Sequence, residues 1–106
     1  MTALLPHKSS SNNNLIAKPR LLVFIVAYNA EASIASVLSR IPYSLTHNYD
    51  VEILIIDDSS RDNTFEVAES IRKTENFAFP LHVLYNPDNQ GYGGNQKIGY
   101  HFAVTK

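Results

Sequence analysis

The sequence of 106 residues contains no cysteine. This absence excludes a disulfide framework and zinc sites built from thiolates, and it is compatible with a reducing compartment. The four histidines offer no alternative, because they do not show metal-ligand spacing (His7, His47, His82 and His101). We therefore predict no metal site from these residue types.

Neither sign of charge dominates, since 9 basic side chains stand against 10 acidic ones and the formal net charge is -1. Nucleic acid is therefore an unfavourable main partner, because contacts to phosphates need a basic surface. The longest apolar run, Leu21 to Ala27, is far shorter than the roughly 20 residues that span a bilayer. No basic region followed by an apolar core marks a secretory signal. These absences predict a soluble, cytoplasmic protein, with a place at the cytoplasmic face of a membrane left open.

Three apolar runs are predicted to be strands. Leu21 to Ala27 and Ile53 to Ile56 are apolar without interruption, which is typical of strands covered on both faces of a parallel sheet. The third run, Leu81 to Tyr85, alternates only weakly.

Helical patterns separate and follow these strands. The first helix is predicted after Asn29 as its N-cap and is stopped by Pro42, and the second begins after a capping-box pattern at Asn63 in which Asp62 is the alternative cap. A third helix is predicted from Asn95 onward. Because a β-α-β crossover implies parallel strands, we expect a three-layer α/β/α fold with a mostly parallel, Rossmann-like sheet.

The chain is expected to divide into a leader and one domain. Residues 1–19 contain the polar run Ser9 to Asn14 and are predicted to be a flexible leader, and residues 20–106 form the domain. The last helical pattern reaches Lys106 without a stop signal, and three parallel strands leave an apolar edge open. The sequence therefore looks truncated.

Two carboxylates, Asp57 and Asp58, directly follow the second strand. Ligands of open α/β sheets bind in the crevice beyond the carboxyl ends of the strands, which places these acids where chemistry is expected. Adjacent strand residues point to opposite faces, so the two carboxylates do not form one acid/base pair. The alternative is that they shape a turn and cap the next helix, together with Ser59, Ser60 and Asp62. We favour ligand binding.

Tyr28 ends the first strand beside the same crevice. Its ring either stacks on a planar base or covers the core, and the spacing does not decide between these roles.

Glycines gather between Asn89 and Gly94. Gly91, Gly93 and Gly94 permit positive φ and close approach to a ligand, Asn89 and Gln90 add donors, and the helix N-terminus that follows favours anions. From glycine content alone, a turn without a ligand is the commoner interpretation. The stretch is neither the dinucleotide fingerprint, which follows a first strand, nor a Walker A loop, which needs Gly-Lys-Ser/Thr.

Taken together, Val26 to Glu31, Ile56 to Thr64 and Asn89 to Gly99 resemble the amino-terminal half of a family 2 glycosyltransferase of the GT-A type. That group includes dolichol-phosphate mannosyltransferases and polyprenyl-phosphate sugar transferases. The resemblance covers Leu21 to about Val104, and the order and spacing of the three motifs make it specific.

The resemblance implies roles for particular residues. Ala27 and Tyr28 would lie against the base and ribose, with Glu31 nearby. Asp58 would hydrogen-bond the base, with Asp57 beside it. The three glycines would approach the diphosphate (Gly91, Gly93 and Gly94), while Tyr92 stands where the family often has a basic residue.

The resemblance also implies partners and a cofactor. The donor would be a UDP- or GDP-sugar, and the acceptor a lipid phosphate such as polyprenyl phosphate, or a saccharide, in cell wall or glycolipid synthesis. The family holds Mg or Mn on the diphosphate with an acidic motif beyond the following strand, and this chain ends before it. Without that ion the departing diphosphate loses its main electrostatic assistance, so we expect these residues to be inactive alone and assign no catalytic residue.

A second hypothesis is a nucleotide-binding or receiver-like α/β module without chemistry. Receiver domains need an acceptor aspartate at the end of a later strand, whereas Tyr85 is followed by Asn86-Pro87-Asp88 in a turn. Titration with uridine or guanosine diphosphate separates the two hypotheses.

Overall fold

The computed structural model describes residues 2–7, 18–74 and 77–105 of the chain. Four strands form one sheet in the order β1-β2-β3-β4, and the three pairs are β1 with β2 antiparallel, β2 with β3 parallel and β3 with β4 parallel. The strands are β1 (Thr2–His7), β2 (Arg20–Ala27), β3 (Asp50–Asp58) and β4 (Leu81–Asn86).

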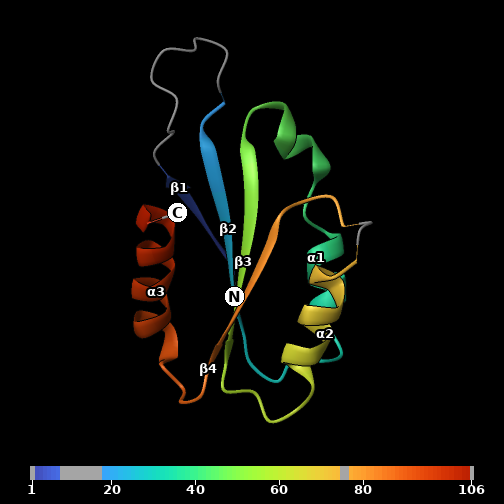
Figure 1. Ribbon diagram of the computed structural model, residues 1–106, viewed down its shortest axis with the longest axis vertical. Helices are drawn as coiled ribbons and strands as arrows, with labels where there is room; N and C mark the ends of the chain where they lie inside the picture. Colours follow the sequence, from blue (N-terminus) through green and yellow to red (C-terminus); the bar gives the residue numbers. More distant parts are fainter. Residues whose placement is uncertain (1, 8–17, 75–76, 106) are drawn as a thin grey trace.

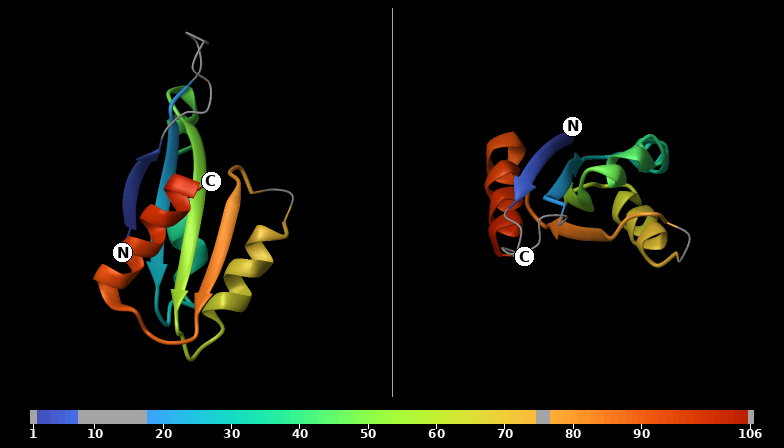
Figure 2. Two further views of the ribbon diagram at one scale, coloured as in Figure 1. Left: turned by 60° about the vertical axis from the view of Figure 1, so that its left-hand side comes forward. Right: turned by 90° about the horizontal axis from the view of Figure 1, so that it is seen from above.

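Helices cover both faces of this sheet (Figure 1). On one face lie α1 (Ile34–Ser39) and α2 (Thr64–Arg72), and on the other lies α3 (Gly91–Thr105). A short 3-10 helix, η1 (Tyr43–His47), follows α1. The two further views in Figure 2 show the sheet between the helices. The predicted three-layer α/β/α fold with its parallel core is therefore confirmed.

The two central strands bury both of their faces, as their unbroken apolar sequences predict. Ile53 and Ile55 of β3 belong to the core beneath α1 and α2, and Leu54 and Ile56 belong to the core beneath α3. All four side chains are fully buried. Burying a side chain of this size stabilises the fold by about 1.5 to 3 kcal/mol. Because β3 contributes such side chains to the cores on both faces of the sheet, it is the central strand for stability.

The prediction of a flexible leader is wrong for Thr2–His7, which forms the edge strand β1. Its register pairs Thr2 with Ile25 and His7 with Arg20. The physical reason is that the edge of β2 would otherwise leave a row of backbone groups without partners, and an antiparallel strand supplies them. The polar run Ser9 to Asn14 lies outside the described residues.

The starts of α1 and α3 differ from the predicted ones, whereas α2 starts after Asn63 as predicted, with the alternative cap Asp62 supplying the side-chain bond. The residue before α1 is Ser33, not Asn29, and Asn63 precedes α2 without a side-chain cap bond. Asp62 takes that role instead, because its Oδ1 accepts a hydrogen bond of 3.0 Å from the Thr64 N–H. The α3 helix begins at Gly91, four residues before the predicted Asn95.

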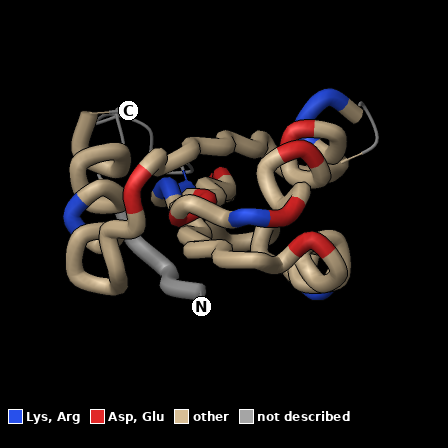
Figure 3. Tube along the Cα trace, turned by 90° about the horizontal axis from the view of Figure 1, so that it is seen from below, with Lys and Arg blue, Asp and Glu red and all other residues tan. Residues whose placement is uncertain are grey.

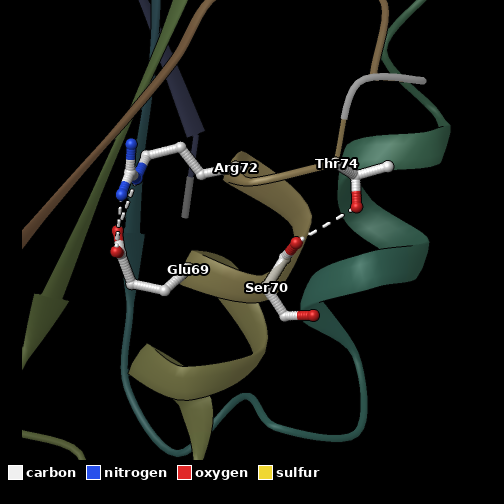
Figure 4. Close-up of polar contacts among 4 residues, drawn as sticks. All are labelled: Glu69, Ser70, Arg72 and Thr74. Carbon is white, nitrogen blue, oxygen red and sulfur yellow. Dashed lines mark hydrogen bonds and ion pairs between the residues drawn. The ribbon is translucent and has the colours of Figure 1, made fainter.

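Side chains also tie the end of α2 (Figure 4). The Glu69 carboxylate accepts hydrogen bonds from Nε and Nη2 of Arg72 at 2.8 and 2.9 Å, and the Thr74 hydroxyl donates to the Ser70 carbonyl at 3.1 Å. The charge of Glu69 is therefore balanced within the helix.

Candidate functional site

The carboxyl ends of β2, β3 and β4 meet at one edge of the sheet, and Figure 3 views the molecule from this edge. In that view acidic positions lie at the sheet edge and on the helices opposite α3. The register sets Ala27 beside Asp57, and Asp58 beside Asn86. All three predicted motifs therefore converge on this edge.

The two adjacent carboxylates point to opposite faces, as expected from the strand geometry. Asp58 contacts the start of α3, whereas Asp57 contacts the loop that leads to α2. Both are buried, Asp57 at 0% exposure and Asp58 at 3%. They serve two separate places, one on each side of the sheet.

Asp58 fastens the first turn of α3 to the end of β3. Its Oδ1 accepts hydrogen bonds from the Gln90 N–H at 2.8 Å and from Nδ2 of Asn86 at 3.0 Å. Its Oδ2 accepts from the Gly91 N–H at 3.2 Å. Because the first N–H groups of a helix have no partner within the helix, this carboxylate is a long-range cap. The cap explains why α3 begins at Gly91.

Two asparagines extend this contact into a network. Nδ2 of Asn86 also donates to Oδ1 of Asn95 at 2.8 Å, and Nδ2 of Asn95 donates to the Gly91 carbonyl at 2.7 Å. Asn95 is fully buried. Sequence reasoning assigned no role to Asn86 and treated Asn95 only as a helix start. The signal that was available is the spacing of Asn95, one helical turn after Gly91.

The environment of Asp58 acts on its acidity in two directions. Burial is the largest single influence and raises the pKa, but the amide groups of Gln90, Asn86, Asn95 and Gly91 together outweigh it, so the pKa lies below its ordinary value. The carboxylate is therefore ionised, and it holds the glycine-rich turn as an anion.

Asp57 is only half satisfied. Its Oδ1 accepts a hydrogen bond from the Ser60 N–H at 2.9 Å, while its Oδ2 is buried and has no hydrogen-bond partner among the described residues. It lines a pocket of about 270 Å³. Asp57 therefore shapes the turn, as the alternative prediction states, and one of its oxygens has no partner among the described residues.

The loops after β2 and β3 are bound to each other. Oδ1 of Asn29 accepts from the Arg61 N–H at 2.8 Å, and the Asn29 N–H donates to the Ser60 hydroxyl at 2.8 Å. Oε1 of Glu31 accepts from the Asn63 N–H at 3.2 Å. Glu31 therefore holds the loop above α2 in place, a role that the sequence does not indicate.

Two non-glycine residues in these loops have a positive φ, Asn29 at 49° and Ser59 at 66°. Such a conformation is costly for serine, on the order of 1 kcal/mol or more, and it persists only where neighbouring groups fix it. The Ser59 hydroxyl donates to the Pro87 carbonyl at 3.1 Å, which supplies one such contact. Strained backbone therefore concentrates at the carboxyl edge.

Tyrosine rings stand out from this edge. Tyr28 is 51% exposed, so it does not cover the core, and its face is open to a planar ligand. Tyr92, in the first turn of α3, is half exposed, and its hydroxyl accepts a hydrogen bond from Nε2 of Gln96. Ala27 is buried at the end of β2 and offers its backbone rather than its side chain.

The glycines differ in what each permits. Gly91 has a φ of 67°, which favours glycine, and a Cβ atom at Gly91 or Gly93 would meet nothing within 4 Å. At Gly94 a Cβ would lie 2.9 Å from Cβ of Gln90. The predicted glycine turn is therefore the open first turn of a helix.

Neither a metal centre nor a membrane span emerges from the residues that the structure describes. No three side chains of the types His, Asp or Glu come together there as a set that fits a metal ion. No helix in the described ranges has the length and apolar character needed to cross a membrane.

The comparisons with known proteins agree with the geometry. The model of "Glycosyl transferase family 2" matches residues 22–106. The chain is similar to an "Uncharacterized glycosyltransferase" of Haemophilus influenzae, with 25% identity over 79 residues. This match takes in 74% of the chain and 24% of the relative, so the chain spans about a quarter of that protein's length. No solved structure matches the chain. Because the family match covers most of its length and all three motifs of the sheet edge, the chain belongs to glycosyl transferase family 2.

Proposed function

We propose that this chain binds the nucleotide diphosphate of a UDP- or GDP-sugar donor at the carboxyl edge of its sheet. The observation that carries the proposal is the bonding of the Asp58 carboxylate to the N–H groups of Gln90 and Gly91. This contact joins the end of β3 to the open first turn of α3. The N-terminus of a helix, where glycines let a ligand approach the backbone, is suited to phosphate groups. Tyr28, which follows β2 at the same edge of the sheet, has an exposed aromatic ring.

The proposed roles follow from exposure and remaining hydrogen-bond capacity. Tyr28 stacks on the base, and Ala27 flanks the ribose with its backbone. An ionised carboxylate has about four acceptor positions. Asp58 already accepts from Asn86, Gln90 and Gly91 and is also acted on by the Asn95 amide, so an N–H group of the base would share Oδ2 with the Gly91 N–H. Gly91, Gly93 and Gly94 let the diphosphate approach the backbone of the turn, although the Gly91 N–H itself already donates to Asp58 and Asn89.

Two of the expected residues act indirectly in this proposal. Asp57 and Glu31 hold the loops that carry Ser60 and Asn63, so they position the site without touching the nucleotide. Tyr92 occupies a place where a basic side chain would pair with phosphate, and its hydroxyl offers a hydrogen bond in place of a charge.

The whole protein would transfer the sugar to a lipid phosphate or a saccharide. A magnesium or manganese ion on the diphosphate is part of that proposal, and the described residues do not by themselves provide a ligand set for it. When bound, such an ion would neutralise charge on the leaving diphosphate. We therefore expect the 106-residue chain to bind nucleotide without transferring sugar.

Calorimetric titration of the chain with UDP and GDP tests the proposal. Tyr28→Ala should weaken binding by about fivefold or more, because stacking of one base on an aromatic ring contributes roughly 1 to 3 kcal/mol. Tyr100→Ala is the matched control, since Tyr100 is an exposed tyrosine on α3, at 60% exposure, more than two helical turns after Gly91. Equal affinities in the two variants, or no binding of either nucleotide by the folded chain, would contradict the proposal.

A further inference from the structure

A pocket of about 270 Å³ lies on the α2 side of the sheet, and the donor site proposed above does not use it. It is formed where the ends of β3 and β4 meet the first turns of α2. Its lining residues are Asp57, Ser60, Asp62, Phe65, Glu66 and Tyr85. Since Asp58 and α3 occupy the opposite face of β3, the pocket is separated from the glycine-rich turn by the sheet.

Asp57, one of the residues that line this pocket, carries a buried acceptor without a partner among the described residues. Asp57 has no exposed surface, and its Oδ2 accepts no hydrogen bond from the described residues. A buried carboxylate oxygen without a donor is costly, because desolvation is not repaid by any contact. Oδ2 of Asp57 therefore lacks a hydrogen-bond donor, and a positively charged donor group would form the strongest hydrogen bond with this carboxylate oxygen.

The acidic side chains around the pocket also favour a positively charged ligand. Asp62 and Glu66 stand beside Asp57, and no ion pair within 4 Å neutralises any of the three among the described residues. Glu69, one turn further along α2, is different because Arg72 already balances it (Figure 4).

The backbone N–H groups at the start of α2 are not available to bind an anionic ligand in the pocket. The N–H of Thr64 already donates to Asp62, and the N–H of Asn63 donates to Glu31. These two donors are therefore engaged, and three acidic side chains line the pocket beside them (Asp57, Asp62 and Glu66). The pocket excludes anions and favours cations.

Aromatic rings complete the wall. Phe65 and Tyr85 meet edge to face, with centroids 5.6 Å apart and an interplanar angle of 73°. A planar guanidinium or an alkylammonium group is attracted to an aromatic face and also donates to carboxylates. A bare metal ion fits less well, because the described residues do not form a set of three metal ligands.

We infer that this pocket binds a small organic cation with a guanidinium or ammonium head. The head donates a hydrogen bond to Oδ2 of Asp57 and faces Asp62 and Glu66, and its apolar part packs against Phe65 and Tyr85. The pocket lies on the other face of the sheet from the glycine-rich turn and takes a ligand of opposite charge, and Asp57 is shared because it also holds the loop at Ser60.

Amide NMR titration of the 106-residue chain with methylguanidinium and methylammonium, at constant ionic strength and without nucleotide, tests the inference. We expect saturable shifts centred on the pocket residues, with a dissociation constant on the order of millimolar. Glu66→Gln and Asp57→Asn should each weaken binding about tenfold, because each removes one charge-assisted contact. Glu66 is exposed, so its variant keeps the test valid if the buried Asp57→Asn substitution prevents folding.

Asp50→Asn is the control, since it makes the same change of charge at the exposed, opposite end of β3. Shifts that rise linearly without saturation, equal affinities in Glu66→Gln and Asp50→Asn, or tighter saturation of the same amides by Mg²⁺ would each overturn the inference. Displacement of the cation by UDP or GDP would also overturn it. The cation titration contains no nucleotide, so its result can be interpreted even if the chain does not bind UDP or GDP. In the same way, nucleotide binding can be interpreted even if the cation does not bind.

Discussion

At the scale of single residues, the two aspartates after β3 have different tasks despite their adjacency. Asp58 is an anion surrounded by amide donors and fixes the start of α3, whereas Asp57 keeps one oxygen without a donor. Their identity and position at a strand end were predictable from sequence, and so was their divergence, because side chains alternate along a strand. The partners of Asp58 were not, since Asn86 and Gly91 reach it only through the register of β4 and the return of the chain into α3.

The depressed pKa of Asp58 makes stability depend on pH. The folded state binds this proton less tightly than the unfolded chain, so the stabilisation is complete above the ordinary pKa of 3.8 and is lost as pH falls through the lower folded pKa. Asp58→Asn should lower the free energy of unfolding by about 1 to 3 kcal/mol near pH 7, because buried amide donors lose a charged acceptor.

Urea unfolding at neutral and acidic pH checks this prediction. The difference between the wild-type chain and Asp58→Asn should shrink as the pH falls into the acidic range. Asp88→Asn, at an exposed position, serves as the control. A difference that stays constant with pH would show that the charge of Asp58 does not contribute.

At the scale of elements, the start of α3 and the strand β1 are the two features that the sequence did not predict. The start of α3 was predicted at Asn95 because three glycines within four residues are typical of a turn. The helix instead starts at Gly91, whose N–H donates to the distant Asp58 and to the neighbouring Asn89. The edge strand β1 was missed for a similar reason, since nothing local in the leader indicates pairing with β2. In both cases a contact with a part of the chain that is distant in sequence outweighs the conformational preference of the local residues.

The packing of α3 depends on a glycine that faces the sheet. A Cβ atom at Gly99 would lie 2.8 Å from Cε2 of Phe24, a buried ring of β2. Gly99→Ala should therefore destabilise the chain by about 1 to 3 kcal/mol through overpacking, even though alanine favours helix. Gly93→Ala has open space and should be neutral or slightly stabilising.

Thermal unfolding of the two glycine variants distinguishes these cases. A melting temperature of Gly99→Ala equal to that of Gly93→Ala would show that α3 does not pack on Phe24 as closely as described.

At the scale of the whole molecule, the apolar runs determined the three-layer arrangement, because strands buried on both faces require helices on both sides. Leu21 to Ala27 and Ile53 to Ile56 therefore predicted β2 and β3 with their correct parallel pairing. The network through Asn86 and Asn95, and the pocket at Asp57, depend on which side chains meet across the sheet, and no pattern along one segment contains that information.

The most direct test of the central claim is an amide NMR titration of the 106-residue chain with UDP and GDP. If the nucleotide diphosphate binds at the carboxyl edge, saturable shifts will centre on Tyr28, Asp58 and the first turn of α3, including Gly91 and Gly93. Shifts confined to the opposite end of the sheet, around Asp50, or no saturable shifts with either nucleotide, would contradict the account.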